Sequence, residues 1–318
     1  MIQSKYYNPE LQPDILGGEN SFADSNYTSD EVFEKLYEPL REAFPELIKR
    51  ENIGKDQSGT YDMWCYTFTP ENYEKTIYLS AGVHGRNEIQ SYMGLARLMT
   101  LIYTKNEGIP QLEYLRNKVR FITVPIVNVW DVSTRANGEP GFSPNNSNNI
   151  NLNRNWKGDD NEQEVKNVKK LVARYKDEID FAFDLHTDPE GLPGWGSYML
   201  IYGQGMDKVY TDRLLEVCGY LDQKNEKLRE IKVAFRGEDV DYPSGSSWDV
   251  NTTPDYRRQD LTSSCSSVLW REFGIPSAVP EHGDRKFSRV RGDAVDMTRA
   301  IELYANQILG QLNFVIEE

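Results

Sequence analysis

The chain has 318 residues, of which 38% are hydrophobic and 12% aromatic, so it is long and apolar enough to bury a sizeable core. Its formal net charge of −14 argues against nucleic acid or an anionic membrane as a partner, because both would be repelled by the surface as a whole. Its three cysteines show neither a disulfide framework nor metal-site spacing, which indicates reduced thiols: Cys65, Cys218 and Cys265. With no secretion signal at the start and no apolar run of bilayer length, we expect a cytoplasmic protein; the sequence leaves its oligomeric state open.

The beginning of the chain differs in composition from the rest. Residues 1–27 are polar and rich in Asn, Asp, Gly and Pro, which predicts an N-terminal arm, whereas residues 28–318 show no break and predict a single catalytic domain. Thr28 and Glu31 have the spacing of a helical capping box, and apolar residues follow at helical spacing. We expect Pro39 to interrupt that helix.

Apolar runs alternate with helical patterns along the chain. Buried strands are predicted at residues 76–83, 119–127, 179–185 and 275–280, and further strands at 61–68 and 198–202. Helical spacing is found at residues 89–103, 165–175, 206–221 and 297–308, whereas the polar stretch 128–156 has no periodicity. Strands that alternate with helices are typical of an α/β fold. We therefore expect a single domain with a mixed, largely parallel sheet and helices on both faces.

Polar side chains follow three of the predicted buried strands. His84 and Glu88 come after the first, His186 after the third and Glu281 at the end of the last. The carboxyl ends of parallel strands meet at one edge of a sheet, where α/β proteins keep their sites. A lone histidine at a strand end is more often a capping or core residue, but here two of only three histidines end buried strands. Two imidazoles and a carboxylate are suitable ligands for zinc, and a second carboxylate can activate water.

Several motifs together resemble a known family. They are Phe44-Pro45, Ile53-Gly54-Lys55, Gly82-Val83-His84-Gly85, Pro125 with Asn128, Asn151-Leu152-Asn153-Arg154-Asn155-Trp156, Asp184-Leu185-His186, and Gly274-Ile275-Pro276 with Glu281. In order and spacing this set resembles the zinc carboxypeptidases related to carboxypeptidase A. The resemblance extends from about Ser29 to Leu309 and is carried by the set, not by any single motif.

The resemblance implies a zinc cofactor and a role for each matching residue. The zinc ligands would be His84, Glu88 and His186, and Glu281 would be the general base. Asn153 and Arg154 occupy the positions that bind the terminal carboxylate of the substrate, which a guanidinium can pair in a bidentate manner. Arg135 matches the arginine that polarises the scissile carbonyl, and Tyr256 the tyrosine placed over the substrate.

The spacing of the first two ligands departs from the family. The family has two residues between its histidine and glutamate, whereas three residues separate His84 from Glu88. Either Glu88 still reaches the metal, or Asn87 takes the ligand position and the affinity for zinc is reduced. Because an anionic oxygen suits zinc better than an amide does, we favour Glu88.

These observations favour a zinc-dependent metallocarboxypeptidase that hydrolyses a C-terminal peptide bond with a metal-activated water and a glutamate base. Two alternatives stay open. One is a zinc deacylase of N-acyl amino acids, similar to succinylglutamate desuccinylase and aspartoacylase, and the other is a binding protein that keeps the peptidase fold without turnover. The expected partner is accordingly a peptide, with cell-wall peptides included, or an acyl-amino-acid substrate.

Overall fold

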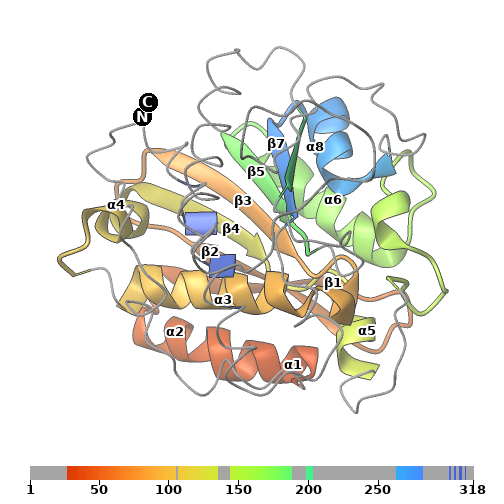
Figure 1. The fold of residues 1–318 in the computed structure, drawn as a ribbon, viewed down its shortest axis with the longest axis horizontal. Coiled ribbons are helices and arrows are strands. Elements are labelled where there is room, and N and C mark those ends of the chain that lie inside the picture. Colours follow the sequence, from red (N-terminus) through yellow and green to blue (C-terminus); the bar gives the residue numbers. More distant parts are fainter. Residues whose placement is uncertain are drawn as a thin grey trace, which may run out of the picture.

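The computed structural model describes residues 27–104, 107–134, 144–187, 198–202 and 263–281, and in addition residues 301, 304, 305, 308, 309 and 312. Within this part, seven strands form one sheet in the order β1-β2-β4-β3-β5-β7-β6 (Figure 1). The strands are β1 (Ile48–Lys55), β2 (Asp62–Phe68), β3 (Lys75–Ala81), β4 (Val119–Val124), β5 (Phe181–Leu185), β6 (Tyr198–Tyr202) and β7 (Ser277–Glu281). Residues 1–26 of the predicted arm lie outside the described residues, so the division of the chain near residue 28 stays a prediction.

The centre of the sheet is parallel and its margins are antiparallel. β4, β3, β5 and β7 run parallel to one another, β1 and β2 form an antiparallel hairpin at one margin, and β6 pairs antiparallel with β7 at the other. Every residue of β4 and of β5 is buried, as expected for strands that are covered on both faces. The predicted mixed, largely parallel α/β sheet is therefore confirmed.

Helices cover both faces of this sheet (Figure 1). The described helical segments are α1 (Ser29–Val32), η3 (Phe33–Tyr37), α2 (Glu38–Ala43), η4 (Gly85–Glu88), α3 (Ile89–Thr104), α4 (Pro110–Lys118), α5 (Val129–Thr134), η5 (Leu152–Arg154), α6 (Gln163–Tyr175) and α8 (Cys265–Phe273). α1, α2 and α3 lie on one side, and α6 and α8 on the other (Figure 1). No helix in this described part is long and apolar enough to cross a bilayer.

The first helix begins at the predicted capping box and is interrupted near the predicted proline. The Thr28 hydroxyl accepts the backbone N–H of Glu31 at 3.2 Å, and the Glu31 carboxylate accepts the backbone N–H of Thr28 at 2.9 Å, which confirms the capping box. Pro39 lies in the first turn of α2, directly after the five-residue π-helical segment η3. Because proline has no N–H to donate, the regular helical ladder cannot run through it, and the predicted interruption is found.

Several helical segments were not predicted from the sequence. α5 and η5 lie inside the stretch 128–156, which we expected to have no regular structure; they are too short for a hydrophobic period to be visible. α4 is mostly polar, and α8 buries two serines, Ser266 and Ser267, beside its apolar residues, which weakens its hydrophobic pattern. β4 also ends earlier than expected, at Val124, because Pro125 cannot donate to a strand ladder.

Of the two helices predicted after residue 200, only the last is partly described. Residues 301, 304, 305, 308, 309 and 312 are helical and buried, which agrees with the predicted stripe at residues 297–308. The side chain of Tyr304 lies against Gly94 of α3. The predicted helix at residues 206–221 lies outside the described residues, as does Cys218.

The contact between α3 and the last helix gives a stability prediction. A Cβ atom on Gly94 would come within 2.5 Å of Cδ1 of Tyr304. Alanine normally stabilises a helix interior by about 1 kcal/mol relative to glycine, but forced overpacking costs about 1–3 kcal/mol. We expect Gly94→Ala to lower the free energy of unfolding by about 1 kcal/mol in urea denaturation. In a Tyr304→Ala background the same change should be neutral or stabilising; an equal loss in both backgrounds would contradict this contact.

Candidate metal centre

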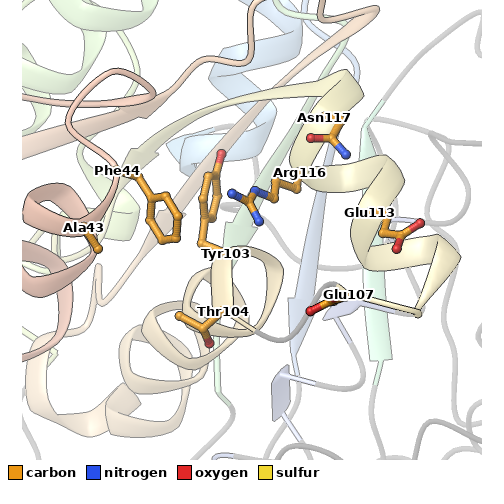
Figure 2. A pocket seen from close by; sticks show the side chains of 8 residues that line it. All are labelled: Ala43, Phe44, Tyr103, Thr104, Glu107, Glu113, Arg116 and Asn117. Atoms are coloured by element: carbon orange, nitrogen blue, oxygen red, sulfur yellow. The ribbon is translucent and has the colours of Figure 1, made fainter.

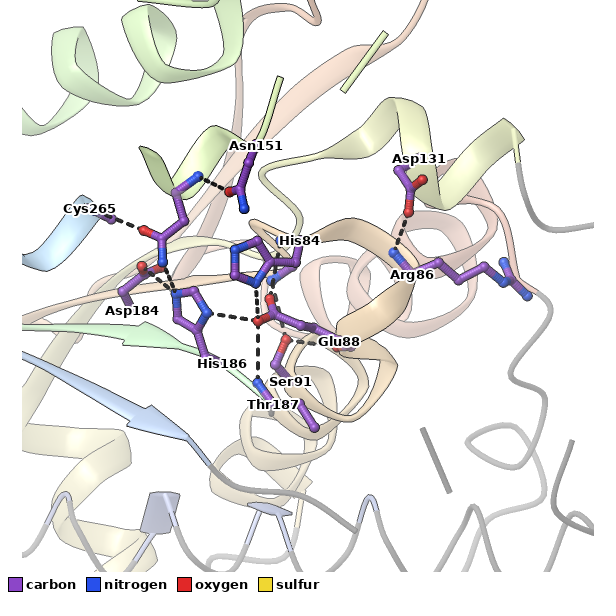
Figure 3. A network of polar contacts seen from close by, with 12 residues as sticks. His84, Arg86, Glu88, Ser91, Asp131, Asn151, Asp184, His186, Thr187 and Cys265 are labelled. Atoms are coloured by element: carbon purple, nitrogen blue, oxygen red, sulfur yellow. Dashed lines mark hydrogen bonds and ion pairs between the residues drawn. The ribbon is translucent and has the colours of Figure 1, made fainter. Parts of the chain in front are cut away.

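The turn between β3 and α3 places His84 and Glu88 next to each other. Gly85, the first residue of this turn, has φ of +57°, a conformation that glycine adopts without strain. A Cβ atom at Gly85 would collide with the carboxylate of Asp131, which accepts the backbone N–H of Arg86 at 2.8 Å (Figure 3). The turn is therefore tight and tied to α5, and its 3-10 geometry lets Glu88 reach back toward His84.

The carboxylate of Glu88 lies between two imidazole rings (Figure 3). Its Oε1 atom is 2.9 Å from Nδ1 of His84 and 2.7 Å from Nδ1 of His186. Its Oε2 atom accepts the backbone N–H of His84 at 3.2 Å, and the backbone N–H of Thr187 points at Oε1 from 3.4 Å. Asn87 is half-buried, and its backbone N–H donates to the carbonyl of His84 at 3.3 Å. The structure thus brings the carboxylate of Glu88 to both histidine rings.

Burial and charge act on Glu88 in opposite directions. The residue has no exposed surface, and burial by itself raises the pKa of a carboxyl group. The nearby rings of His186 and His84 outweigh this effect and hold the pKa of Glu88 well below its ordinary value. The carboxylate is therefore ionised throughout the physiological pH range.

His186, which directly follows β5, is held at three points. Its backbone N–H donates to the carbonyl of Pro280 at 3.0 Å, and its own carbonyl accepts the hydroxyl of Tyr304 at 2.9 Å. Its ring Nε2 lies 2.8 Å from Oδ2 of Asp184 (Figure 3). The side chain is fully buried, and these contacts turn its Nδ1 atom toward Glu88.

Asp184 is itself fixed by neighbouring residues. Ser80 is its register partner in the parallel pair β3–β5, and the hydroxyl of Ser80 donates to Oδ1 of Asp184 at 2.8 Å. Both side chains are fully buried. The thiol of Cys265 lies beside them; burial, together with the negative charge of Asp184, raises the pKa of this thiol far above its usual range. Cys265 and Cys65 are both buried free thiols, as predicted for these two.

Asn153 and Arg154 lie on η5, at different depths. Asn153 is buried; its Oδ1 accepts the backbone N–H of Cys265 at 3.1 Å, and its Nδ2 is 3.5 Å from Nε2 of His186. Arg154 is exposed, and its Nη1 donates to the carbonyl of Asn153 at 3.0 Å. Their predicted role in binding a substrate carboxylate stays a prediction.

The remaining predicted site residues are placed in part. Glu281 is the last residue of β7, which is the parallel neighbour of β5, so its main chain lies at the same sheet edge as His186. The ends of β3, β5 and β7 therefore meet at one edge, as expected for the residues that follow them. Arg135 and Tyr256 lie outside the described residues.

The side chains at this edge fit a metal ion. Two imidazole nitrogens and one carboxylate oxygen lie within 4.8 Å of one another and form the only such group among the described residues. Neutral imidazole and carboxylate are the ligand types of catalytic zinc sites with two histidines and one glutamate. A group of this kind can hold zinc through His84, Glu88 and His186.

A separate hollow lies at the other end of α3. It measures about 570 Å³ and is lined by Ala43, Phe44, Tyr103, Thr104, Glu107, Glu113, Arg116 and Asn117 (Figure 2). α3 has 16 residues and is therefore about 24 Å long, which keeps this hollow far from Glu88. The Arg116 guanidinium lies 4.9 Å from the centre of the Phe44 ring. The lining holds no histidine or cysteine, so the hollow adds nothing to the metal centre.

Sequence reasoning gave no role to several residues that hold the ligands in place. Asp184 lies in β5 two positions before His186, which directly follows the strand, and in extended chain side chains two positions apart point to the same side. That spacing was the available signal. Ser80, Tyr304 and the backbone of Thr187 carry no such signal, because their contacts depend on strand register and on long-range packing.

Comparisons with known proteins agree with this architecture. The sequence profile of the zinc carboxypeptidase family matches residues 33–191, which is half of the chain. No curated protein sequence matches. Among solved structures, the chain is similar to a metallo-carboxypeptidase from Burkholderia cenocepacia, with 20% identity and a TM-score of 0.60 over 91% of this chain and 70% of that one.

Two further solved structures have the same fold. Carboxypeptidase A from Helicoverpa armigera is 14% identical, with a TM-score of 0.64 over 94% of this chain and 75% of that one. Thrombin activatable fibrinolysis inhibitor is 13% identical, with a TM-score of 0.66 over 96% of this chain and 80% of that one. At these identities the structural likeness concerns the fold alone.

Proposed function

The chain belongs to the zinc carboxypeptidase family, and from this premise we propose that it is a zinc-dependent metallocarboxypeptidase that hydrolyses the C-terminal peptide bond of a peptide. The observation that carries the proposal is the buried carboxylate of Glu88, which contacts an imidazole nitrogen of His84 and of His186 at the carboxyl edge of the sheet. Two imidazoles and a carboxylate are the donors of a catalytic zinc site, and this edge of the sheet is where α/β proteins bind their ligands.

In the proposed reaction each residue has one task. His84, Glu88 and His186 hold zinc, which when bound would polarise water and the scissile carbonyl. Glu281 accepts a proton from the attacking water and passes it to the leaving amine. Its place at the end of β7, beside the strand that leads to His186, supports this role.

The substrate is oriented by its free carboxylate. Arg154 is the proposed partner, because a guanidinium can donate two parallel hydrogen bonds to a carboxylate, and Asn153 lies beside it in the sequence. Arg135 is proposed to polarise the scissile carbonyl and Tyr256 to lie over the substrate. These assignments follow the family positions of the residues.

The proposal is tested with a panel of peptides that carry either a free or an amidated C-terminus, each assayed with added zinc and with a chelator. We expect release of the C-terminal residue only from the free acids, with no release after chelation. Cleavage of N-acyl amino acids in place of peptides would identify a zinc deacylase. Zinc binding without hydrolysis of either class would identify a binding protein with the peptidase fold.

Arg154 gives a prediction on the substrate side. Loss of a hydrogen bond to a charged group costs about 1.5–3 kcal/mol, so Arg154→Ala should lower kcat/KM for free-acid peptides by roughly 10- to 100-fold, mainly through KM. Zinc content should not change. Arg174→Ala is a matched control. Arg174 is an exposed arginine in the last turn of α6, and it pairs with Glu51 at 2.8 Å. Equal losses in the two variants would contradict the assignment of Arg154.

A further inference from the structure

We infer that Asp184 is a positioning residue that sets which nitrogen of His186 is available to the metal, an inference that rests on the proposed function. The observation is a continuous line of buried contacts from Ser80 through Asp184 and His186 to Glu88. All four side chains have no exposed surface, so water does not compete for these hydrogen bonds.

The two ring nitrogens of His186 have different partners. Nε2 of His186 lies 2.8 Å from Oδ2 of Asp184, and at this distance a carboxylate oxygen can accept a hydrogen bond from a ring N–H. A histidine that ligates a metal is neutral and therefore has one unprotonated nitrogen. With the proton fixed on Nε2, that nitrogen is Nδ1, the atom that faces Glu88.

The surroundings of Asp184 offer no simple replacement for it. The nearby amide of Asn153 directs its Nδ2 atom, a donor, at Nε2 of His186 from 3.5 Å, while its oxygen is held by the backbone N–H of Cys265. On the other side, the hydroxyl of Ser80 donates to Oδ1 of Asp184 and so requires an acceptor there.

These constraints predict the effect of Asp184→Asn, which keeps the shape of the side chain. The introduced amide should turn its oxygen toward the donating hydroxyl of Ser80 and its NH2 group toward His186. Nε2 would then have to accept, which moves the ring proton to Nδ1 and blocks the nitrogen that faces the metal centre. Adding Ser80→Ala removes the requirement for an acceptor, so the amide can reverse and accept from Nε2 again.

The experiment measures zinc affinity by competition with a chromophoric chelator, using the full chain. We expect Asp184→Asn to weaken zinc binding about 10- to 100-fold, the range found when partners of metal-ligating histidines are removed. The Asp184→Asn/Ser80→Ala double variant should recover several-fold of that loss. Asp56→Asn is the matched control, because Asp56 is also a buried carboxylate but accepts only backbone N–H groups, those of Ser58, Thr60 and Tyr61. It should bind zinc like the unchanged chain.

A spectroscopic measurement separates positioning from loss of structure. The chain has only three histidines, so the imidazole N–H signals of the 15N-labelled, zinc-loaded protein can be assigned by substitution. We expect a slowly exchanging Nε2–H signal for His186 that Asp184→Asn abolishes and Asp56→Asn retains. Suppose that the unchanged chain binds zinc, and that Asp184→Asn has the same zinc affinity and the same Nε2–H signal. That result would overturn this inference but leave the proposed function standing. Equal weakening in the Asp56→Asn control would also overturn it. If the unchanged chain binds no zinc, the proposed function and this inference both fail.

Discussion

Replacement of His186 by alanine should remove zinc from the protein. His186 supplies one of three donors that lie within 4.8 Å of one another, and two protein ligands seldom hold a catalytic zinc. The variant purified with added zinc, then dialysed, should contain less than one tenth of the zinc of the unchanged chain, by an order-of-magnitude expectation. Peptide hydrolysis should be lost with the metal.

The same metal analysis separates Glu88 from Asn87 and serves as the control. Glu88→Ala should lose zinc as His186→Ala does, because it removes the carboxylate that faces both imidazoles. Asn87→Ala should keep zinc, because the side chain that contacts both imidazoles is the carboxylate of Glu88. Loss of zinc in Asn87→Ala with retention in Glu88→Ala would reverse the ligand assignment.

Substitution of Glu281 by glutamine should separate metal binding from turnover. The amide has nearly the shape of the carboxyl group but cannot accept the proton, so kcat should fall by about 10²-fold or more. Zinc content should stay at the level of the unchanged chain, since Glu281 is not one of the proposed ligands. Turnover measured with a free-acid peptide, together with zinc content on the same sample, checks both statements.

Two outcomes would contradict the role of Glu281. Full activity of the glutamine variant would show that another group accepts the proton. Loss of zinc together with activity would make Glu281 a ligand, in place of a base. Glu272 provides a matched control, because its carboxylate forms an ion pair with Lys169 at 2.7 Å and has no proposed role in the site. Glu272→Gln should change neither kcat nor zinc content.

The arrangement of the sheet followed from the sequence because its central strands are largely apolar on both faces. Largely apolar runs such as those of β4 and β5 are found where helices cover both sides of a sheet, and alternation with helical patterns indicates parallel strands. The ends of three such runs then placed His84, His186 and Glu281 at one edge. Position along parallel strands was sufficient for this, without any knowledge of side-chain contacts.

The choice between Glu88 and Asn87 needed the structure. Donor chemistry favoured Glu88, but the extra residue after His84 left its reach open until the 3-10 turn was seen. That turn depends on the glycine conformation at Gly85 and on the buried carboxylate of Asp131, which is far away in the sequence. Contacts of this kind are set by packing between elements, and no local pattern encodes them.

The hydrogen-bonded support behind the ligands was also beyond local patterns. Ser80 contacts Asp184 only because β3 and β5 pair in one register, in which these two residues are partners. A shift of one residue would turn Ser80 to the opposite face of the sheet. Tyr304 reaches the carbonyl of His186 from a helix more than a hundred residues later in the chain, which is a consequence of tertiary packing.

The most direct test of the central claim is the zinc content of the purified protein. Elemental analysis should find one zinc per chain after saturation and dialysis in the unchanged protein, and none in a variant that lacks both His84 and His186. One zinc per chain is expected because the donor group at the sheet edge is proposed to hold a single ion. A folded, unchanged protein that contains no zinc after saturation, or a double variant that still binds one zinc per chain, would contradict the account.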